Sequence, residues 1–329
     1  MRCLSSIFNF STLRGPWPIP RGAVFALVLL LLAEASTRWL VARGVLETEG
    51  SLRKLVENHL ADITAHKPTL WFLGNSTLAY GVDTSLLSSR LNQKVAKMPF
   101  GSASLGGSVA MLDFYLRQAP QKPHLVIVTA SKDDLNTKGY RADVSRRYIE
   151  ISRHDSLPAD WTPMLRNARG LITSKFVSPV VALMGIFKNT RTSSPQPAGT
   201  RPEPRFDGVP IPRTDPWFGS LAKDFTFDED AFANLGSISA KHGVPCTVIL
   251  LPITDALAAF HDELHPDIPY RSIREQTARR CLEHQIEFVD WGEVRTDYEK
   301  FRDPYHFNGD GMDELTVRLV SLLQSRRTE

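Results

Sequence analysis

The chain has 329 residues, of which 42% are hydrophobic and 23% are charged, and its formal net charge is +3. These proportions are typical of a globular protein with a substantial core and exclude wholesale disorder. No basic run is interleaved with aromatic residues, and no cysteine or histidine spacing matches a metal or cofactor motif, so we expect no nucleic acid, metal or cofactor as a partner.

The N-terminus predicts an export segment. Three arginines precede an apolar run over residues 22–33, and no acidic residue comes before Glu34. A basic leader followed by an apolar block sends the following chain across a membrane. A helix continuing to about residue 41 would stay in the lipid bilayer as an anchor. Alternatively, Ala33-Glu34-Ala35 is a cleavage site and the protein is secreted, or the run is a buried core helix.

The rest of the chain, residues 45–329, alternates short apolar runs with helix-length amphipathic stretches. Apolar runs without polar alternation predict strands that are covered on both faces. They span residues 69–73, 95–98, 124–129, 247–251 and 286–290. Helices are predicted over residues 83–91, from the small-residue loop 101–107 to residue 116, and over residues 228–242, 270–284 and 311–323.

Strand–helix alternation implies right-handed crossovers and parallel strands. We therefore predict a three-layer, doubly wound α/β domain with a mainly parallel five-stranded sheet, preceded by a leader or anchor in residues 1–44. Ligands of such sheets bind outside the carboxyl ends of the strands, so the chemistry should lie there.

The alternation breaks between residues 140 and 225. A proline-rich stretch over residues 188–217 predicts an extended insertion. Two or three helices can precede it within residues 145–187. The insertion could be a lid, a partner surface or an excursion without a role. Cys246 and Cys281 are interpreted as small buried hydrophobes, with a disulfide between them open in an exported domain.

Two short motifs suggest a catalytic site. Gly74-Asn75-Ser76 follows the first predicted strand, and a serine at a tight strand-to-helix turn is exposed. Gly74 is expected to allow a sharp turn. Asp303 and His306 stand three residues apart before the last predicted helix. A histidine can take the proton of a serine, and a carboxylate on its other nitrogen orients the ring.

Together these motifs resemble the SGNH, or GDSL-type, hydrolase superfamily, with the serine first and Asp-x-x-His last. The sequence around these motifs is most similar to the membrane-anchored branch related to alginate O-acetyltransferases and the teichoic-acid D-alanylation protein. The resemblance implies Ser76 as nucleophile, His306 as base and Asp303 as its orienting acid.

The resemblance also implies an oxyanion hole built by the middle blocks. Gly101 best matches the glycine donor of the second block, alongside the N–H of Ser76. The third block should read Gly-x-Asn-Asp, but its asparagine position falls on Lys132 or Asp133, depending on the alignment, and neither is an asparagine. Lys132 is a candidate cationic substitute, and Asn136 is close but out of register.

Two hypotheses follow. The first is an extracytoplasmic serine esterase or O-acyltransferase acting on acyl esters of an envelope or exported polysaccharide. The second is a catalytically degenerate scaffold protein that keeps the fold. His261 and His265 stand four apart among acidic residues but lack a metal-site pattern, so we predict a solvated acidic loop there.

Overall fold

The computed structural model describes residues 52–154, 205–211 and 224–326. The chain divides into two compact units, Met1–Glu57 and Asn58–Glu329. The predicted export segment lies outside the described residues, as does most of the insertion. Among the helices that are described, none is long and apolar enough to cross a membrane.

The second unit is built on five parallel strands in the order β2-β1-β3-β4-β6. The strands are β1 (Leu70–Gly74), β2 (Val95–Pro99), β3 (Leu125–Ala130), β4 (Cys246–Leu250) and β6 (Glu287–Asp290). The predicted parallel five-stranded sheet is therefore confirmed, with strand bounds shifted by about one residue.

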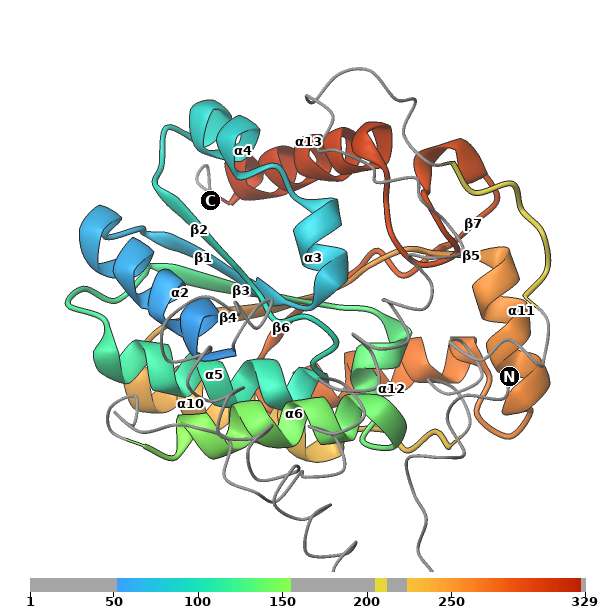
Figure 1. Ribbon diagram of the computed structural model, residues 1–329, viewed down its shortest axis with the longest axis horizontal. Coiled ribbons are helices and arrows are strands. Elements are labelled where there is room, and N and C mark those ends of the chain that lie inside the picture. Colours follow the sequence, from blue (N-terminus) through green and yellow to red (C-terminus); the bar gives the residue numbers. More distant parts are fainter. Residues whose placement is uncertain (1–51, 155–204, 212–223, 327–329) are drawn as a thin grey trace, which may run out of the picture. The chain divides into compact units, whose positions relative to one another are not determined.

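Helices cover both faces of the sheet (Figure 1). One face carries α3 (Ser76–Gly81), α4 (Thr84–Leu91) and α13 (Gly309–Ser325). The other carries α5 (Leu105–Gln118), α6 (Gly139–Ser152), α10 (Glu229–His242) and α12 (Tyr270–Glu283). This arrangement confirms the three-layer α/β prediction.

Unbroken apolar strands form the core because helices exclude water from both of their faces. Every residue of β1 is buried, and Trp71, Phe72 and Leu73 are 0% exposed. The predicted helix ends are also present. Asp83 caps α4 by accepting from the Ser85 and Leu86 N–H groups, and Gly243 ends α10 in the left-handed conformation that glycine favours.

Some elements differ from the sequence prediction. The helices α2 (Leu52–His66) and α11 (Asp255–Leu264) were not predicted, nor was the two-residue pairing of β5 (Ile253–Thr254) with β7 (Val294–Arg295). Such short strands and the six-residue α3 carry too few residues to show a period.

The two cysteines of the described unit are free thiols. Cys246 opens β4 and Cys281 lies on α12, both buried. Burial raises the pKa of Cys246 to about 11 and that of Cys281 to about 12. Both therefore behave as small hydrophobes, and the disulfide left open by the sequence is not formed.

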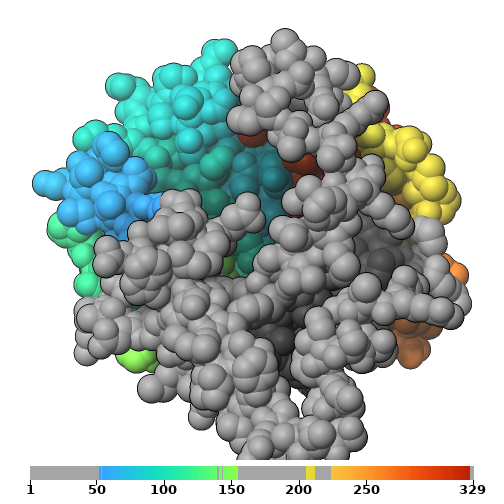
Figure 2. All heavy atoms as spheres, in the orientation of Figure 1, coloured from blue at the N-terminus to red at the C-terminus, as the bar shows by residue number. Residues whose placement is uncertain are grey.

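One piece of the predicted insertion, residues 205–211, is described. It is extended and lies at the surface beside the C-terminal part of the chain (Figure 2). The Phe206 N–H donates to the Phe301 carbonyl at 2.8 Å, and the Phe206 ring packs edge-on against Tyr298. This part of the insertion is thus fastened to the domain just before Asp303.

Candidate active site

The first part of the site is the turn after β1. Asn75 caps α3, with its side-chain oxygen accepting from the Thr77 N–H at 2.7 Å and the Thr77 hydroxyl at 2.6 Å. Gly74 is needed for space and not for an unusual turn, because a Cβ there would lie 2.2 Å from Thr129 Oγ1 and 2.9 Å from the Thr129 carbonyl oxygen. Gly74 therefore lets the end of β1 pack closely against Thr129 of β3, two residues before α3 begins at Ser76.

The second part is the loop before α13. Asp303 accepts from the Tyr305 N–H at 2.9 Å and the His306 N–H at 2.8 Å, and its Oδ2 lies 2.9 Å from His306 Nδ1. Partial burial raises the pKa of Asp303. The hydrogen bonds and charge of His306, together with the two backbone donors, lower this pKa by more, so the net shift is downward. Asp303 is thus an acceptor at neutral pH, and Nδ1 of His306 must carry the proton.

The two parts meet at Ser76. Its Oγ lies 2.9 Å from His306 Nε2, although 230 residues separate them in sequence. Because Nδ1 donates to Asp303, Nε2 of the neutral ring accepts from the serine hydroxyl. The His306 side chain is 18% exposed, so the pair is open to a ligand. The structure therefore brings Ser76, His306 and Asp303 together in the order that nucleophilic catalysis needs.

Two backbone donors stand near this serine. The register pairs Gly74 with Pro99, and the Phe100 N–H donates to the Gly74 carbonyl at 2.7 Å, which places Gly101 beside the Ser76 turn. In the described residues, no acceptor binds the N–H of either Ser76 or Gly101. An ideal Cβ on Gly101 would meet no atom within 4 Å, so this edge is open.

Lys132 and Asn136 have other partners. The buried Lys132 ammonium pairs with Asp133, which is buried too. Asn136 donates to the Asp224 carbonyl at 3.0 Å and accepts from the Thr226 N–H at 2.9 Å. Asn136 therefore fastens the segment that enters α10, and among the described residues no hydrogen bond joins either side chain to Ser76.

The prediction of a solvated loop around His261 is wrong. His261 lies on α11 and is 0% exposed, with Nε2 2.9 Å from the Ile268 carbonyl. Burial, with the nearby Lys132 charge, lowers its pKa to about 4. His261 shares the buried face of α11 with the apolar Leu257, Ala258 and Phe260. In the sequence this apolar pattern is too short to predict a buried helix among acidic residues.

A buried polar network behind the site was missed by the sequence analysis. The Tyr305 hydroxyl accepts from Asn75 Nδ2 at 2.8 Å and from Arg141 Nη2 at 2.6 Å, and it lies 2.7 Å from Ser131 Oγ. Asp134 accepts from Asn75, Arg141 and the Ser131 N–H. Asn75 and Tyr305, the sequence neighbours of Ser76 and His306, are thus hydrogen-bonded to each other.

Electrostatics hold this network together. Burial raises the pKa of Asp134 to about 6, although the adjacent Arg141 charge opposes the rise. Burial acts to lower the pKa of Arg141, but Tyr305 and the carboxylates raise it overall, so it stays a cation. Two members of this network lie within motifs that the sequence analysis identified: Asp134 in the block compared with Gly-x-Asn-Asp, and Tyr305 within Asp-x-x-His. Nothing in the sequence marked Arg141.

The rim of the site carries an aromatic ring and a cation. Tyr80 is 42% exposed and its ring packs edge-on against His306, with centroids 5.1 Å apart. The Arg302 guanidinium lies over the Tyr80 ring at 4.6 Å from its centroid. Tyr80 therefore contacts both the His306 imidazole and the Arg302 guanidinium.

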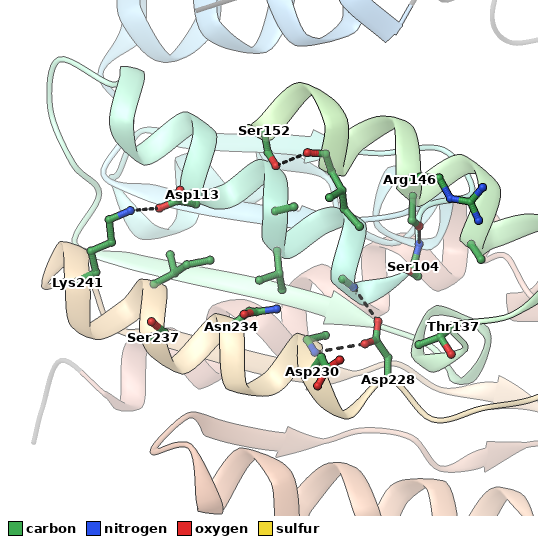
Figure 3. A pocket seen from close by; sticks show the side chains of 18 residues that line it. Ser104, Asp113, Thr137, Arg146, Ser152, Asp228, Asp230, Asn234, Ser237 and Lys241 are labelled. Atoms are coloured by element: carbon green, nitrogen blue, oxygen red, sulfur yellow. Dashed lines mark hydrogen bonds and ion pairs between the residues drawn. The ribbon is translucent and has the colours of Figure 1, made fainter. Parts of the chain in front are cut away.

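A separate hollow of about 610 Å³ lies between α5, α6 and α10 (Figure 3). Its charged lining residues are mostly engaged: Asp228 accepts from the Gly106 N–H at 3.1 Å, and Asp113 pairs with Lys241 at 3.0 Å. None of Ser76, Asp303 and His306 lines it, so it is not part of the candidate active site.

Comparisons with known proteins give similarity in fold. No family model matches the chain, and no curated protein matches it by sequence. A protein from Bacteroides fragilis described as an acylhydrolase has a TM-score of 0.41 and 11% identity, over 84% of this chain and 99% of its own.

Two carbohydrate esterases are also similar. An active-site mutant of a family two carbohydrate esterase from Clostridium thermocellum has a TM-score of 0.31 and 10% identity, over 79% of this chain and 64% of its own. An acetyl xylan esterase from Butyrivibrio proteoclasticus has a TM-score of 0.31 and 11% identity, over 80% of this chain and 65% of its own. The chain thus spans slightly less than two thirds of these esterases.

Proposed function

We propose that the chain is a serine esterase or O-acyltransferase that uses Ser76, His306 and Asp303 on acyl esters of a polysaccharide. The observation that carries this proposal is the continuous hydrogen-bond chain from Ser76 Oγ to His306 Nε2, at 2.9 Å, and from His306 Nδ1 to Asp303 Oδ2, at 2.9 Å. A serine hydroxyl becomes a nucleophile when such a base takes its proton.

The reaction would proceed in two acyl transfers. Ser76 Oγ attacks the acyl carbon while His306 Nε2 takes the hydroxyl proton, and His306 then returns this proton to the departing alcohol. Asp303 keeps the proton on Nδ1 and stabilises the imidazolium. In the second transfer, water or a sugar hydroxyl attacks the acyl-serine, which gives an esterase or an O-acyltransferase respectively.

The developing oxyanion would be held by the N–H groups of Ser76 and Gly101. Both lack an acceptor among the residues described and lie at the same edge of the sheet. The lysine suggested for the third donor is engaged by Asp133. We therefore propose a hole with two backbone donors, and loss of one donor of this kind typically costs about 10²–10³ in rate.

An extracytoplasmic location is part of the proposal. It is supported by the basic leader and the apolar run over residues 22–33, which direct export in either the anchored or the cleaved alternative. A polysaccharide of the cell envelope, or one that is exported, is the polymeric ester that such a location would offer. Its acyl groups are the bonds on which a serine esterase acts.

The test is labelling with a fluorophosphonate probe, which reacts with activated serines. The full chain should form an adduct on Ser76, and Ser76→Ala should abolish it. Ser85→Ala is the matched control, because Ser85 is an exposed helix serine without a histidine partner. A folded protein that acquires no adduct would refute the esterase and favour the scaffold alternative.

A further inference from the structure

The proposed site is assembled from three segments that are far apart in the sequence. The Asn75–Ser76 turn carries the proposed nucleophile, and the loop Asp303–His306 carries the proposed base. The turn Phe100–Ala103 is closed by a 3.0 Å hydrogen bond between its end residues and carries the Gly101 N–H. A misplacement of about 1 Å between reacting groups can cost about a hundredfold in rate. Whatever fixes these segments relative to one another therefore matters for the reaction.

The buried guanidinium of Arg141 is linked to all three segments. Its Nη2 donates to the Tyr305 hydroxyl, in the base loop, at 2.6 Å. Its Nη1 donates to the Ala103 carbonyl at 3.3 Å and also to Asp134. Asp134 in turn accepts from the Asn75 side chain. Arg141 thus contacts two of the segments directly and reaches the third through one carboxylate.

These contacts need the forked shape of the guanidinium. Nη1 and Nη2 donate to different acceptors, and the guanidinium carbon lies over the Tyr305 ring at 5.3 Å from its centroid. A lysine presents a single nitrogen and cannot replace both donors. Arg141 lies on α6, which contains none of the three segments. It therefore holds them from outside the site.

The charge of Arg141 supports the same arrangement. Burial raises the pKa of Asp134 to about 6, and the Arg141 charge is the largest influence that opposes this rise. The ionised Asp134 accepts from the Asn75 side chain on one oxygen and from the Ser131 N–H on the other. Without the guanidinium charge, this acid would take up a proton more readily and would lose part of its capacity to accept.

We propose that Arg141 is a positioning residue of the acyl-transfer reaction, which fixes the nucleophile turn, the base loop and the turn of Gly101 relative to one another. This inference rests on the proposed function. In the part of the chain that the structure describes, Arg141 forms no hydrogen bond with Ser76 or His306. We therefore expect it to affect the rate of the chemical step and not the binding of a ligand.

The test separates the rate of fluorophosphonate labelling from its final extent. Arg141→Lys keeps the charge but loses the fork. Its maximal labelling rate constant should fall about tenfold to a hundredfold, while the probe concentration that gives half of this rate stays the same. The final adduct per folded chain should match that of the native chain. A merely structural role would lower the extent and leave the rate constant of the folded fraction unchanged.

Arg117→Lys is the matched control. Arg117 also stacks on a ring, that of Phe114 at 5.8 Å, pairs with Asp113 at 3.2 Å and donates to the Ser152 carbonyl. These partners lie on α5 and α6 and not in the three site segments. The control should therefore label with the native rate constant and to the native extent.

A second readout needs no reaction, because amide hydrogen exchange reports how firmly a segment is held. In Arg141→Lys, the peptides that contain the hydrogen-bonded N–H groups of Thr77, Ala103 and His306 should exchange faster together. Arg117→Lys should leave their exchange unchanged. Tyr305→Phe removes one acceptor of the fork and serves as the milder variant if Arg141→Lys does not fold. Its labelling rate constant should fall by a smaller factor.

The outcomes distinguish this role from the proposed function. A native rate constant in folded Arg141→Lys, or in Tyr305→Phe where Arg141→Lys does not fold, would overturn the positioning role while the esterase stands. Faster exchange confined to α6 would overturn it too. A native chain that forms no adduct, with three segments that exchange faster in Arg141→Lys, would overturn the proposed function and keep Arg141 as the residue that holds them. No adduct and no change in exchange would overturn both.

Discussion

Removing the Tyr305 hydroxyl tests whether the network behind the site holds it together. In Tyr305→Phe the ring stays, but Asn75 Nδ2 and Arg141 Nη2 lose an acceptor that lies 2.8 Å and 2.6 Å away. Tyr305 is 5% exposed and Arg141 is 4% exposed, so water does not readily replace it. Both groups keep their bonds to Asp134, but each buried N–H that loses its acceptor costs roughly 1–3 kcal/mol, more for a charged group. We expect the free energy of unfolding to fall by about 3 kcal/mol.

Tyr115→Phe is the matched control. Tyr115 is 0% exposed, and its hydroxyl has one neutral partner, His59 Nδ1, at 3.0 Å. Losing one such bond should cost about 1 kcal/mol. Urea denaturation followed by circular dichroism measures both values. Equal losses in the two variants would refute the reasoning, because the charged donor would then carry no extra cost.

Three further expectations follow from the site and its surroundings. Gly74→Ala should destabilise the fold by about 1–3 kcal/mol through overpacking against Thr129, whereas Gly101→Ala, which meets no atom within 4 Å, should leave the melting temperature nearly unchanged. Because burial lowers the pKa of His261 from 6.5 to about 4, the unfolded chain takes up a proton as pH falls through 6.5 while the folded chain does not. Stability should therefore fall between pH 6.5 and 4, by at most about 3 kcal/mol from this group, and His261→Gln should flatten that slope in thermal melts. Asp303→Asn should slow fluorophosphonate labelling by roughly 10³–10⁴ because it leaves the wrong imidazole tautomer; an undiminished rate would exclude Asp303 from the reaction.

Many strands and helix ends of this fold can be predicted from residues that are close together in the sequence. The three central strands β1, β3 and β4 are largely apolar and buried because both of their faces are covered, so each could be predicted within a residue of its ends. Asp83 and Gly243 mark helix ends by chemistry that acts within a few residues. By contrast, α11 has acidic residues beside its buried histidine. Its ten residues are too few for the helical periodicity to show in the sequence, where the acidic composition instead suggests a loop.

The site could be predicted only where its groups are sequence neighbours. Asp303 and His306 meet across three residues, and Gly74-Asn75-Ser76 is continuous. Arg141 reaches Tyr305 across 164 positions from a helix that begins the irregular region. No local pattern records such a contact, because it depends on how α6 packs. The sequence likewise presents Lys132 as a candidate cationic oxyanion donor, because no local pattern indicates that Lys132 and its partner Asp133 are buried.

The wide separation of Ser76 from His306 in the sequence has a consequence for when the proposed activity could first exist. A ribosome that has not yet made residue 306 has made only a serine without its base, and 230 positions lie between them. Any fragment that ends before residue 306 therefore lacks the proposed base, and one that ends between His306 and α13 lacks the helix that packs against α3 and α4. Under the proposed function, reactivity toward an acyl group would therefore require a chain that has been synthesised through residue 306 and has folded.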